Sequence, residues 1–68
     1  MEEILVEFGN RLREIRKGKE ISQEKLAELA ELHRTYVSSV ERGMRNISLV
    51  NIKRLADALE VEMADLMP

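Results

Sequence analysis

The chain has 68 residues, enough for one domain whose small hydrophobic core barely offsets the chain entropy lost on folding. It has no cysteine and one histidine, His33, so disulfides, thiolate metal sites and a zinc site are excluded, and we expect no metal and no cofactor. The formal net charge of −2 excludes a uniformly basic surface.

The first predicted helix has apolar residues at helical spacing. These residues are Ile4, Leu5, Phe8, Leu12 and Ile15. Gly18 follows them and is expected to end the helix, because glycine readily adopts the left-handed backbone conformation found after helices.

The second predicted helix begins at Ser22, whose hydroxyl can accept a hydrogen bond from the first turn, and Glu24 is favourably placed against the helix dipole. Its expected buried stripe is Leu26, Leu29 and Ala30. Small Ala27 would let the next helix approach closely.

The third predicted helix spans 34–42, with His33 as a candidate N-cap and Gly43 after its end. Val37 and Val40 are its expected buried residues. Between it and the second helix lie only a few residues, too few for the two helices to pack antiparallel, so they must cross steeply. This arrangement predicts a helix-turn-helix at residues 22–42, whose second helix fits the major groove of DNA.

The fourth predicted helix spans 49–59 and begins after Ser48, a candidate N-cap, and a last turn at 62–66 closes the chain. One face of the fourth helix carries Leu49, Ile52, Leu55, Ala56 and Leu59. No useful stretch alternates with period two, so no strand is expected. The predicted fold is therefore all-α, with five short helices in a single helix-turn-helix domain over residues 1–68.

Charge is unevenly distributed along the chain. Residues 1–10 carry −3 and residues 55–68 carry −4, whereas residues 11–21 carry +3 and residues 33–54 carry +4; residues 22–32 carry −2. One face can therefore be basic although the whole chain is slightly acidic. The outward side of the third helix is expected to carry Arg34, Thr35, Ser38, Ser39 and Arg42, which are able to hydrogen-bond to bases and phosphates.

The helix-turn-helix resembles the Cro and phage-repressor class through QEKLAELA at 23–30 and RTYVSSVERG at 34–43. The chain most resembles the controller proteins of restriction-modification systems, through RTY at 34–36, ERG at 41–43, RN at 45–46 and its short length. The resemblance covers nearly the whole chain and implies a sequence-specific regulator that binds double-stranded DNA at a near-palindromic operator. A phage-type repressor or an antitoxin-type autoregulator would look similar. A helical protein-interaction module is the alternative from another class.

The resemblance also implies roles for individual residues. Gln23 would contact phosphate from the N-terminus of the second helix, and Arg34 would read guanine with its forked donors. Thr35 and Ser38 would reach neighbouring base edges or phosphates. The remaining expected DNA contacts are Tyr36, Ser39, Arg42, Arg45 and Asn46. For Tyr36, packing at the domain edge is an equal alternative.

Two acidic features stand beside the expected DNA contacts. The class often has glycine where this chain has Glu31, and a left-handed backbone there costs a non-glycine residue roughly 1 kcal/mol or more. Glu24 and Glu28 lie one turn apart on the second helix. They form either a solvated acidic surface or, as in phage repressors, a patch that contacts RNA polymerase.

Helices four and five contain more apolar residues than one face can bury. The surplus is Val50, Val61, Met63 and Met67, which we expect at a homodimer interface in this C-terminal region. Core packing is the alternative for Val61 and Met63. One histidine, no cysteine and scattered carboxylates do not assemble a catalytic group, so no enzyme activity is expected. Without a signal peptide or an apolar run near about 18 residues, we expect a cytoplasmic protein.

Overall fold

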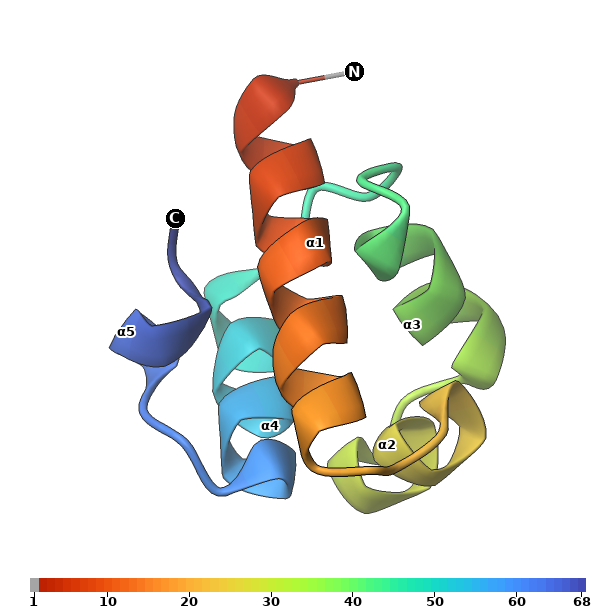
Figure 1. Cartoon of the computed structure of the whole chain (residues 1–68). Coiled ribbons are helices and arrows are strands. Elements are labelled where there is room, and N and C mark those ends of the chain that lie inside the picture. Colours follow the sequence, from red (N-terminus) through yellow and green to blue (C-terminus); the bar gives the residue numbers. More distant parts are fainter. Residues whose placement is uncertain (1) are drawn as a thin grey trace.

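The structure, a computed structural model, describes residues 2–68 and has five helices in this range and no strand (Figure 1). The helices are α1 (Glu3–Gly18), α2 (Gln23–Ala30), α3 (Arg34–Glu41), α4 (Leu49–Leu59) and α5 (Met63–Leu66). The predicted all-α fold of five helices is thus confirmed. The third helix ends at Glu41, one residue before its predicted end.

Serine side chains cap two of the helices, as predicted. Ser22 Oγ accepts a hydrogen bond from the backbone N–H of Lys25 at 2.9 Å, and Ser48 Oγ accepts one from Asn51 at 3.1 Å. His33 does occupy the N-cap position of α3, with extended backbone angles of φ −75° and ψ 142°, but its side chain makes no capping hydrogen bond. The exposed imidazole therefore marks the start of α3 without stabilising it as serine would.

Helix α1 ends at Gly18, as predicted, but the left-handed residue that follows the helix is Glu20, with φ 60°. Glu31 and Glu60 are also left-handed, each with φ 59°, and Gly43 has φ 75°. The left-handed turn expected at Glu31 is therefore present, and it is one of three such turns made by glutamate.

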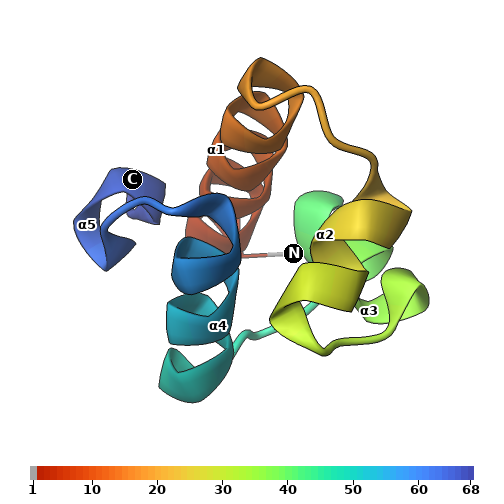
Figure 2. The same cartoon turned by 90° about the horizontal axis from the view of Figure 1, so that it is seen from below.

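In Figure 1 helix α1 lies in front, with α2 and α3 to one side and α4 and α5 to the other, and Figure 2 shows it at one edge of the domain. Helices α2 and α4 also pack against each other. All five helices contribute to one apolar core. Its most completely buried side chains are Leu12, Leu26, Leu55, Leu59, Leu66, Val37 and Val40. Among the described residues, none of the helices has the length and apolarity to span a membrane.

Three predicted interior residues are exposed instead. Leu29 is 48% exposed, Leu49 73% and Ile4 55%. Ile4 and Leu49 lie in the first turns of α1 and α4, outside the central contacts between helices. Leu29 lies at the edge of the narrow buried face of α2, which has only eight residues.

Helix α1 touches the end of α3 without an intervening side chain. A Cβ atom placed on Gly9 would lie 2.5 Å from the backbone oxygen of Val40 and 2.6 Å from that of Glu41. Only glycine allows this approach. Together with buried Ala27 on α2, Gly9 fixes the position of α3 against the body of the domain.

Candidate nucleic-acid interface

The turn of the helix-turn-helix is built by three residues, 31–33, between α2 and α3. Glu31 takes the left-handed conformation, and the next N–H, that of Leu32, donates to the oxygen of Ala27 at 2.9 Å. This bond satisfies a carbonyl at the end of α2 while the chain changes direction. The prediction of a short, steep connection is confirmed, and α3 projects from it along the side of the domain (Figure 1).

The buried residues of α3 determine which side faces outward. Val37, Val40 and Glu41 are buried on the inner side. The predicted DNA-contacting residues all lie off this inner side: Arg34, Thr35 and Arg42 are exposed, and Tyr36, Ser38 and Ser39 are half-buried. Arg34 is the first residue of the helix, where its guanidinium is free to reach beyond the domain.

The hydroxyl of Ser39 is already engaged within its own helix. Its Oγ donates to the backbone oxygens of Thr35 at 3.0 Å and Tyr36 at 2.9 Å. Phosphate oxygens need a donor, and this hydroxyl has its single hydrogen committed. Ser38 is therefore the better placed of the two serines for a DNA contact.

A buried ion pair joins α1 to the C-terminal end of α3. Arg16 Nε is 2.6 Å from Glu41 Oε2, and a second guanidinium nitrogen is 3.1 Å from Oε1. The same guanidinium also donates to the backbone oxygen of Ile21 at 2.8 Å. The two side chains are only 9% and 1% exposed. Arg16 was counted as part of a basic surface in the charge pattern, and this is wrong because its charge is paired in the interior.

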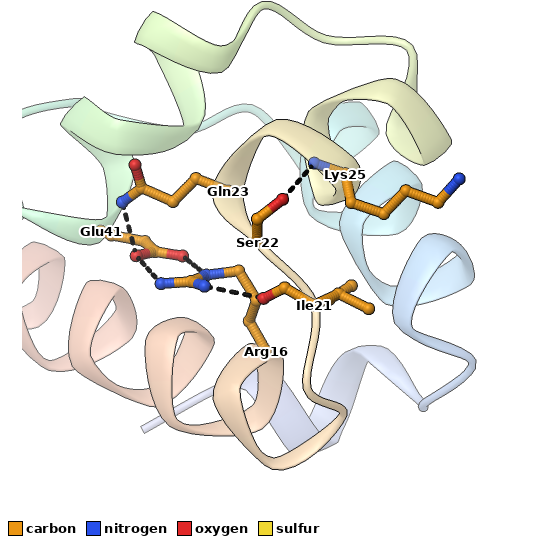
Figure 3. Close-up of polar contacts among 6 residues, drawn as sticks. All are labelled: Arg16, Ile21, Ser22, Gln23, Lys25 and Glu41. Atoms are coloured by element: carbon orange, nitrogen blue, oxygen red, sulfur yellow. Dashed lines mark hydrogen bonds and ion pairs between the residues drawn. The ribbon is translucent and has the colours of Figure 1, made fainter.

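Gln23 is joined to this buried pair (Figure 3). Its Nε2 donates to Glu41 Oε1 at 3.0 Å. The amide carries a second N–H, which this contact leaves for another acceptor. Gln23 is also the first residue of α2, where backbone N–H groups lack partners within the helix and favour an anion.

Most of the exposed basic side chains come from two regions, and Lys25 and Arg54 lie outside them. Arg34, Arg42 and Arg45 lie on α3 and in the loop after it. Arg13, Lys17 and Lys19 lie on and just after α1. Lys53 contributes less, because its Nζ is 2.9 Å from Asp57 Oδ1, and the hydrogen bond and charge of Asp57 raise the pKa of Lys53.

Tyr36 connects α3 to the residues that follow it. Its hydroxyl oxygen accepts a hydrogen bond from Asn51 Nδ2 at 3.1 Å, and Arg45 Cζ lies 5.4 Å from the centre of its ring. The two readings of Tyr36, domain edge and DNA contact, are therefore compatible. Asn46 is exposed in the same loop.

Three residues of this region were missed by the sequence analysis. They are Arg16, Glu41 and Asn51. Glu41 had a usable signal, since it lies four residues after Val37 and hence on the same buried side of the helix. Asn51 had none, because its partner Tyr36 lies on another helix.

Helix α2 carries acidic residues on its surface, and its C-terminal end borders a groove. Glu24 and Glu28 are both exposed, and Glu28 pairs with Lys25 Nζ at 3.1 Å. A groove of about 530 Å³ lies between α2 and α4, and its lining includes Leu29, three carboxylates, Glu31, Asp57 and Glu60, and the guanidinium-bearing Arg54. The groove is therefore of mixed charge, since Arg54 is present and Asp57 pairs with Lys53.

The surplus apolar residues divide into two pairs. Val50 and Met67 are 63% and 45% exposed, whereas Val61 and Met63 are half-buried against the core. Met67 also lines a hollow of about 160 Å³ together with exposed Ile4. Ile4 and Met67 thus share one exposed apolar surface, and Val50 is a further exposed apolar residue on α4.

Comparison with known proteins places this geometry in a family. Residues 12–66 match the family model described as Helix-turn-helix. Over 61 residues the chain is 52% identical to control protein C.BamHI of Bacillus amyloliquefaciens, a match that covers 88% of this chain and 75% of that one.

Two solved structures have the same fold. One is the restriction-modification controller protein C.AhdI from Aeromonas hydrophila, with a TM-score of 0.92 and 59% identity over 93% of this chain and 96% of that one. The other is the tetramer of the controller protein C.Esp1396I in complex with its natural 35 base-pair operator, with a TM-score of 0.87 and 32% identity over 91% and 82%. The chain belongs to the helix-turn-helix family and, within it, to the restriction-modification controller proteins.

Proposed function

We propose that this protein is a sequence-specific transcription regulator that binds double-stranded operator DNA as a homodimer in the cytoplasm and controls a restriction-modification operon. The observation that carries the proposal is the outward side of α3, which presents Arg34, Thr35 and Ser38 from a helix held by buried Val37 and Val40. The relative C.Esp1396I, solved on its operator, supports it. The proposed role is binding, with no catalytic step.

In this proposal the two helices divide the work of recognition. Arg34, at the N-terminal end of α3, donates to guanine O6 and N7, and Thr35 and Ser38 contact neighbouring base edges or phosphates. Gln23 donates its second amide hydrogen to a phosphate, which carries no base identity. Arg42, Arg45 and Asn46 hold the DNA backbone at the end of α3 and in the loop that follows.

The experiment compares Arg34→Ala with Gln23→Ala on duplexes that the pure wild-type protein selects from a randomised pool. We expect Arg34→Ala to cost about 1–3 kcal/mol of binding free energy and to relax the preference for guanine at one position per half-site. Gln23→Ala should weaken binding to all sequences about equally. The selected site should be a near-palindrome with half-sites roughly 34 Å apart.

The measurement is equilibrium binding to the selected duplex and its single-base variants at a fixed salt concentration, then at several. Affinity should fall steeply as salt rises, because phosphate contacts release counterions. A protein-interaction module would select no duplex. If Arg34→Ala kept the wild-type ranking of the variants and Gln23→Ala changed it, the assignment of α3 as the reading helix would be wrong.

We propose, as a second function, that Glu24 and Glu28 contact RNA polymerase bound beside the operator. The supporting observation is that both carboxylates are exposed, one turn apart on α2, the first helix of the helix-turn-helix. Glu28 forms an ion pair with Lys25, which offsets its charge, so Glu24 is the stronger candidate for the polymerase contact.

Replacing Glu24 and Glu28 by Gln tests this contact. Operator binding should be unchanged or slightly tighter, because repulsion between carboxylates and phosphates is lost. Transcription from a promoter beside the operator should fall. Full activation of transcription at confirmed operator occupancy would show that both residues are solvated surface residues without a polymerase contact.

A further inference from the structure

Tyr36 is held from two sides by residues outside its helix. Asn51, in the first turn of α4, donates its Nδ2 hydrogen to the phenol oxygen at 3.1 Å. Arg45, in the loop between α3 and α4, lies with Cζ 5.4 Å from the ring centre. Tyr36 and Asn51 are half-buried and Arg45 is exposed, so the ring is positioned at the edge of the domain with its hydroxyl between interior and surface.

The direction of the hydrogen bond determines what the phenol can still do. A tyrosine hydroxyl has one hydrogen to donate and lone pairs to accept. Asn51 donates to a lone pair of the phenol oxygen, so the hydroxyl hydrogen remains available to donate to an acceptor outside the protein. DNA phosphates offer acceptors only, so the phenol can donate to a phosphate and keep its bond to Asn51. A hydroxyl that already accepts a hydrogen bond is also a stronger donor.

Asn51 is itself firmly placed. Its backbone N–H donates to Ser48 Oγ at 3.1 Å, which fixes the first turn of α4. Its side chain then spans from α4 to α3 and closes the loop of residues 42–48 that carries Arg45 and Asn46. The Asn51 amide therefore orients the Tyr36 hydroxyl and links α4 to α3 across the loop that is proposed to contact DNA.

We propose that Asn51 is a positioning residue of the DNA interface, which directs the free hydroxyl hydrogen of Tyr36 toward a DNA phosphate without touching DNA itself. The inference rests on the DNA binding proposed above. It predicts that the contribution of Asn51 to operator affinity passes through the Tyr36 hydroxyl.

The test is a double-mutant cycle with wild type, Asn51→Ala, Tyr36→Phe and the double variant, each titrated with the duplex that the wild type selects. Alanine is a strong helix former, so α4 is retained, and circular dichroism checks this. We expect each single change to weaken binding about 3- to 10-fold, the range of one hydrogen bond. In the Tyr36→Phe background, Asn51→Ala should change affinity less than about twofold, because its partner oxygen is already gone.

Two further measurements keep the test decisive. Asn10→Ala removes an exposed asparagine of α1 whose side chain accepts a hydrogen bond from Arg13, and it should bind like wild type. Tyr36 is the only tyrosine in the chain, so a 13C label on the tyrosine ring reports this residue alone. Its signal should shift on addition of the duplex in wild type and shift less in Asn51→Ala. If Asn51→Ala does not fold, Asn51→Asp keeps the shape and removes the donor. The charge that this aspartate would add acts in both the wild-type and the Tyr36→Phe backgrounds, so the difference between these backgrounds reports the lost hydrogen bond.

The outcomes are distinct. Equal losses from the Asn51 change in both backgrounds, or no loss in either, with the wild type bound, would overturn the role of Asn51 and leave the proposed function standing. A wild-type protein that selects no duplex would overturn the proposed function, and this inference with it.

Discussion

Single residues at helix ends carry strain in this protein. Glu20, Glu31 and Glu60 all have a left-handed backbone near φ 60°, which brings Cβ close to the following carbonyl oxygen and costs roughly 1–2 kcal/mol each. Glycine, which has no Cβ, would remove this clash, but the chain has glutamate at all three positions. A domain with a small core therefore gives up stability at three of its turns.

Glu31→Gly should stabilise the domain. Relief of the clash outweighs the greater freedom of glycine in the unfolded chain, roughly 0.4–1 kcal/mol, so we expect a net gain of about 0.5–1 kcal/mol and a midpoint of thermal unfolding roughly 4 °C higher. Glu7→Gly, an exposed change inside α1, is the matched control and should destabilise by about 1 kcal/mol. Thermal unfolding followed by circular dichroism measures both. A lower midpoint for Glu31→Gly would show that the turn is unstrained.

At this scale local signals predict the serine caps and the left-handed turn at Glu31, but not the left-handed turn after α1. Ser22 and Ser48 were predicted correctly because a capping bond involves residues only three positions apart. Gly18 was assigned the left-handed turn from residue type alone. In the structure the left-handed residue is Glu20, and the Arg16 guanidinium donates to the oxygen of Ile21 just after it. The same guanidinium pairs with Glu41 on α3, a tertiary contact that residue type alone does not indicate.

At the scale of elements, one network of side chains joins three helices. Arg16 from α1 pairs with Glu41 from α3, and Gln23 from α2 completes the network. Removing one member of a buried pair leaves an uncompensated charge in the interior, which is far more destabilising than loss of an exposed pair.

Arg16→Met should therefore destabilise the domain by about 3–5 kcal/mol. Lys53→Met breaks an exposed pair with Asp57 and is the control, with an expected loss below about 1 kcal/mol. The double variant Arg16→Met, Glu41→Leu should recover most of the stability, because it leaves no buried charge unpaired. Urea unfolding measures all three. A double variant as unstable as Arg16→Met alone would contradict this account.

The number, order and approximate bounds of the helices followed from periodicity, which depends on neighbours along the chain. The ion pair did not follow, because Arg16 and Glu41 are 25 positions apart and the chain has 13 acidic residues among which to choose a partner. For the candidate site, the outward side of α3 was predicted from the buried positions of the same helix. Contacts from other helices, such as Asn51 to Tyr36, depend on how the helices pack and could not be found in this way.

The whole molecule presents an apolar surface that its own core does not use. Val50 and Met67 are exposed, and Ile4 shares a hollow with Met67. A chain with so small a core gains stability by covering such a surface with a second copy. The half-buried Val61 and Met63 are less suitable for testing this surface, since they pack against the core.

We expect the wild type to be a dimer at micromolar concentration and the variant Val50→Asp, Met67→Asp to be a folded monomer, because charges at these exposed positions oppose pairing and leave the core intact. Leu29→Asp, a change of the same kind beside the groove between α2 and α4, should remain a dimer. Sedimentation measures assembly. Operator affinity should fall with assembly, because the second half-site contact is no longer made within one complex. A wild type that remains monomeric at high concentration with full affinity for DNA would refute the dimer.

The bond from Gln23 to Glu41 has a consequence for genetics. One carboxylate anchors the interior and also orients a side chain proposed to contact phosphate. In a random mutagenesis screen scored by loss of a reporter signal, changes at Glu41 would be recovered beside those at true DNA contacts, although Glu41 is 3% exposed and cannot reach DNA. Immunoblotting of each clone separates the two groups, since variants of Glu41 are depleted from the cell while variants of Arg34 accumulate normally.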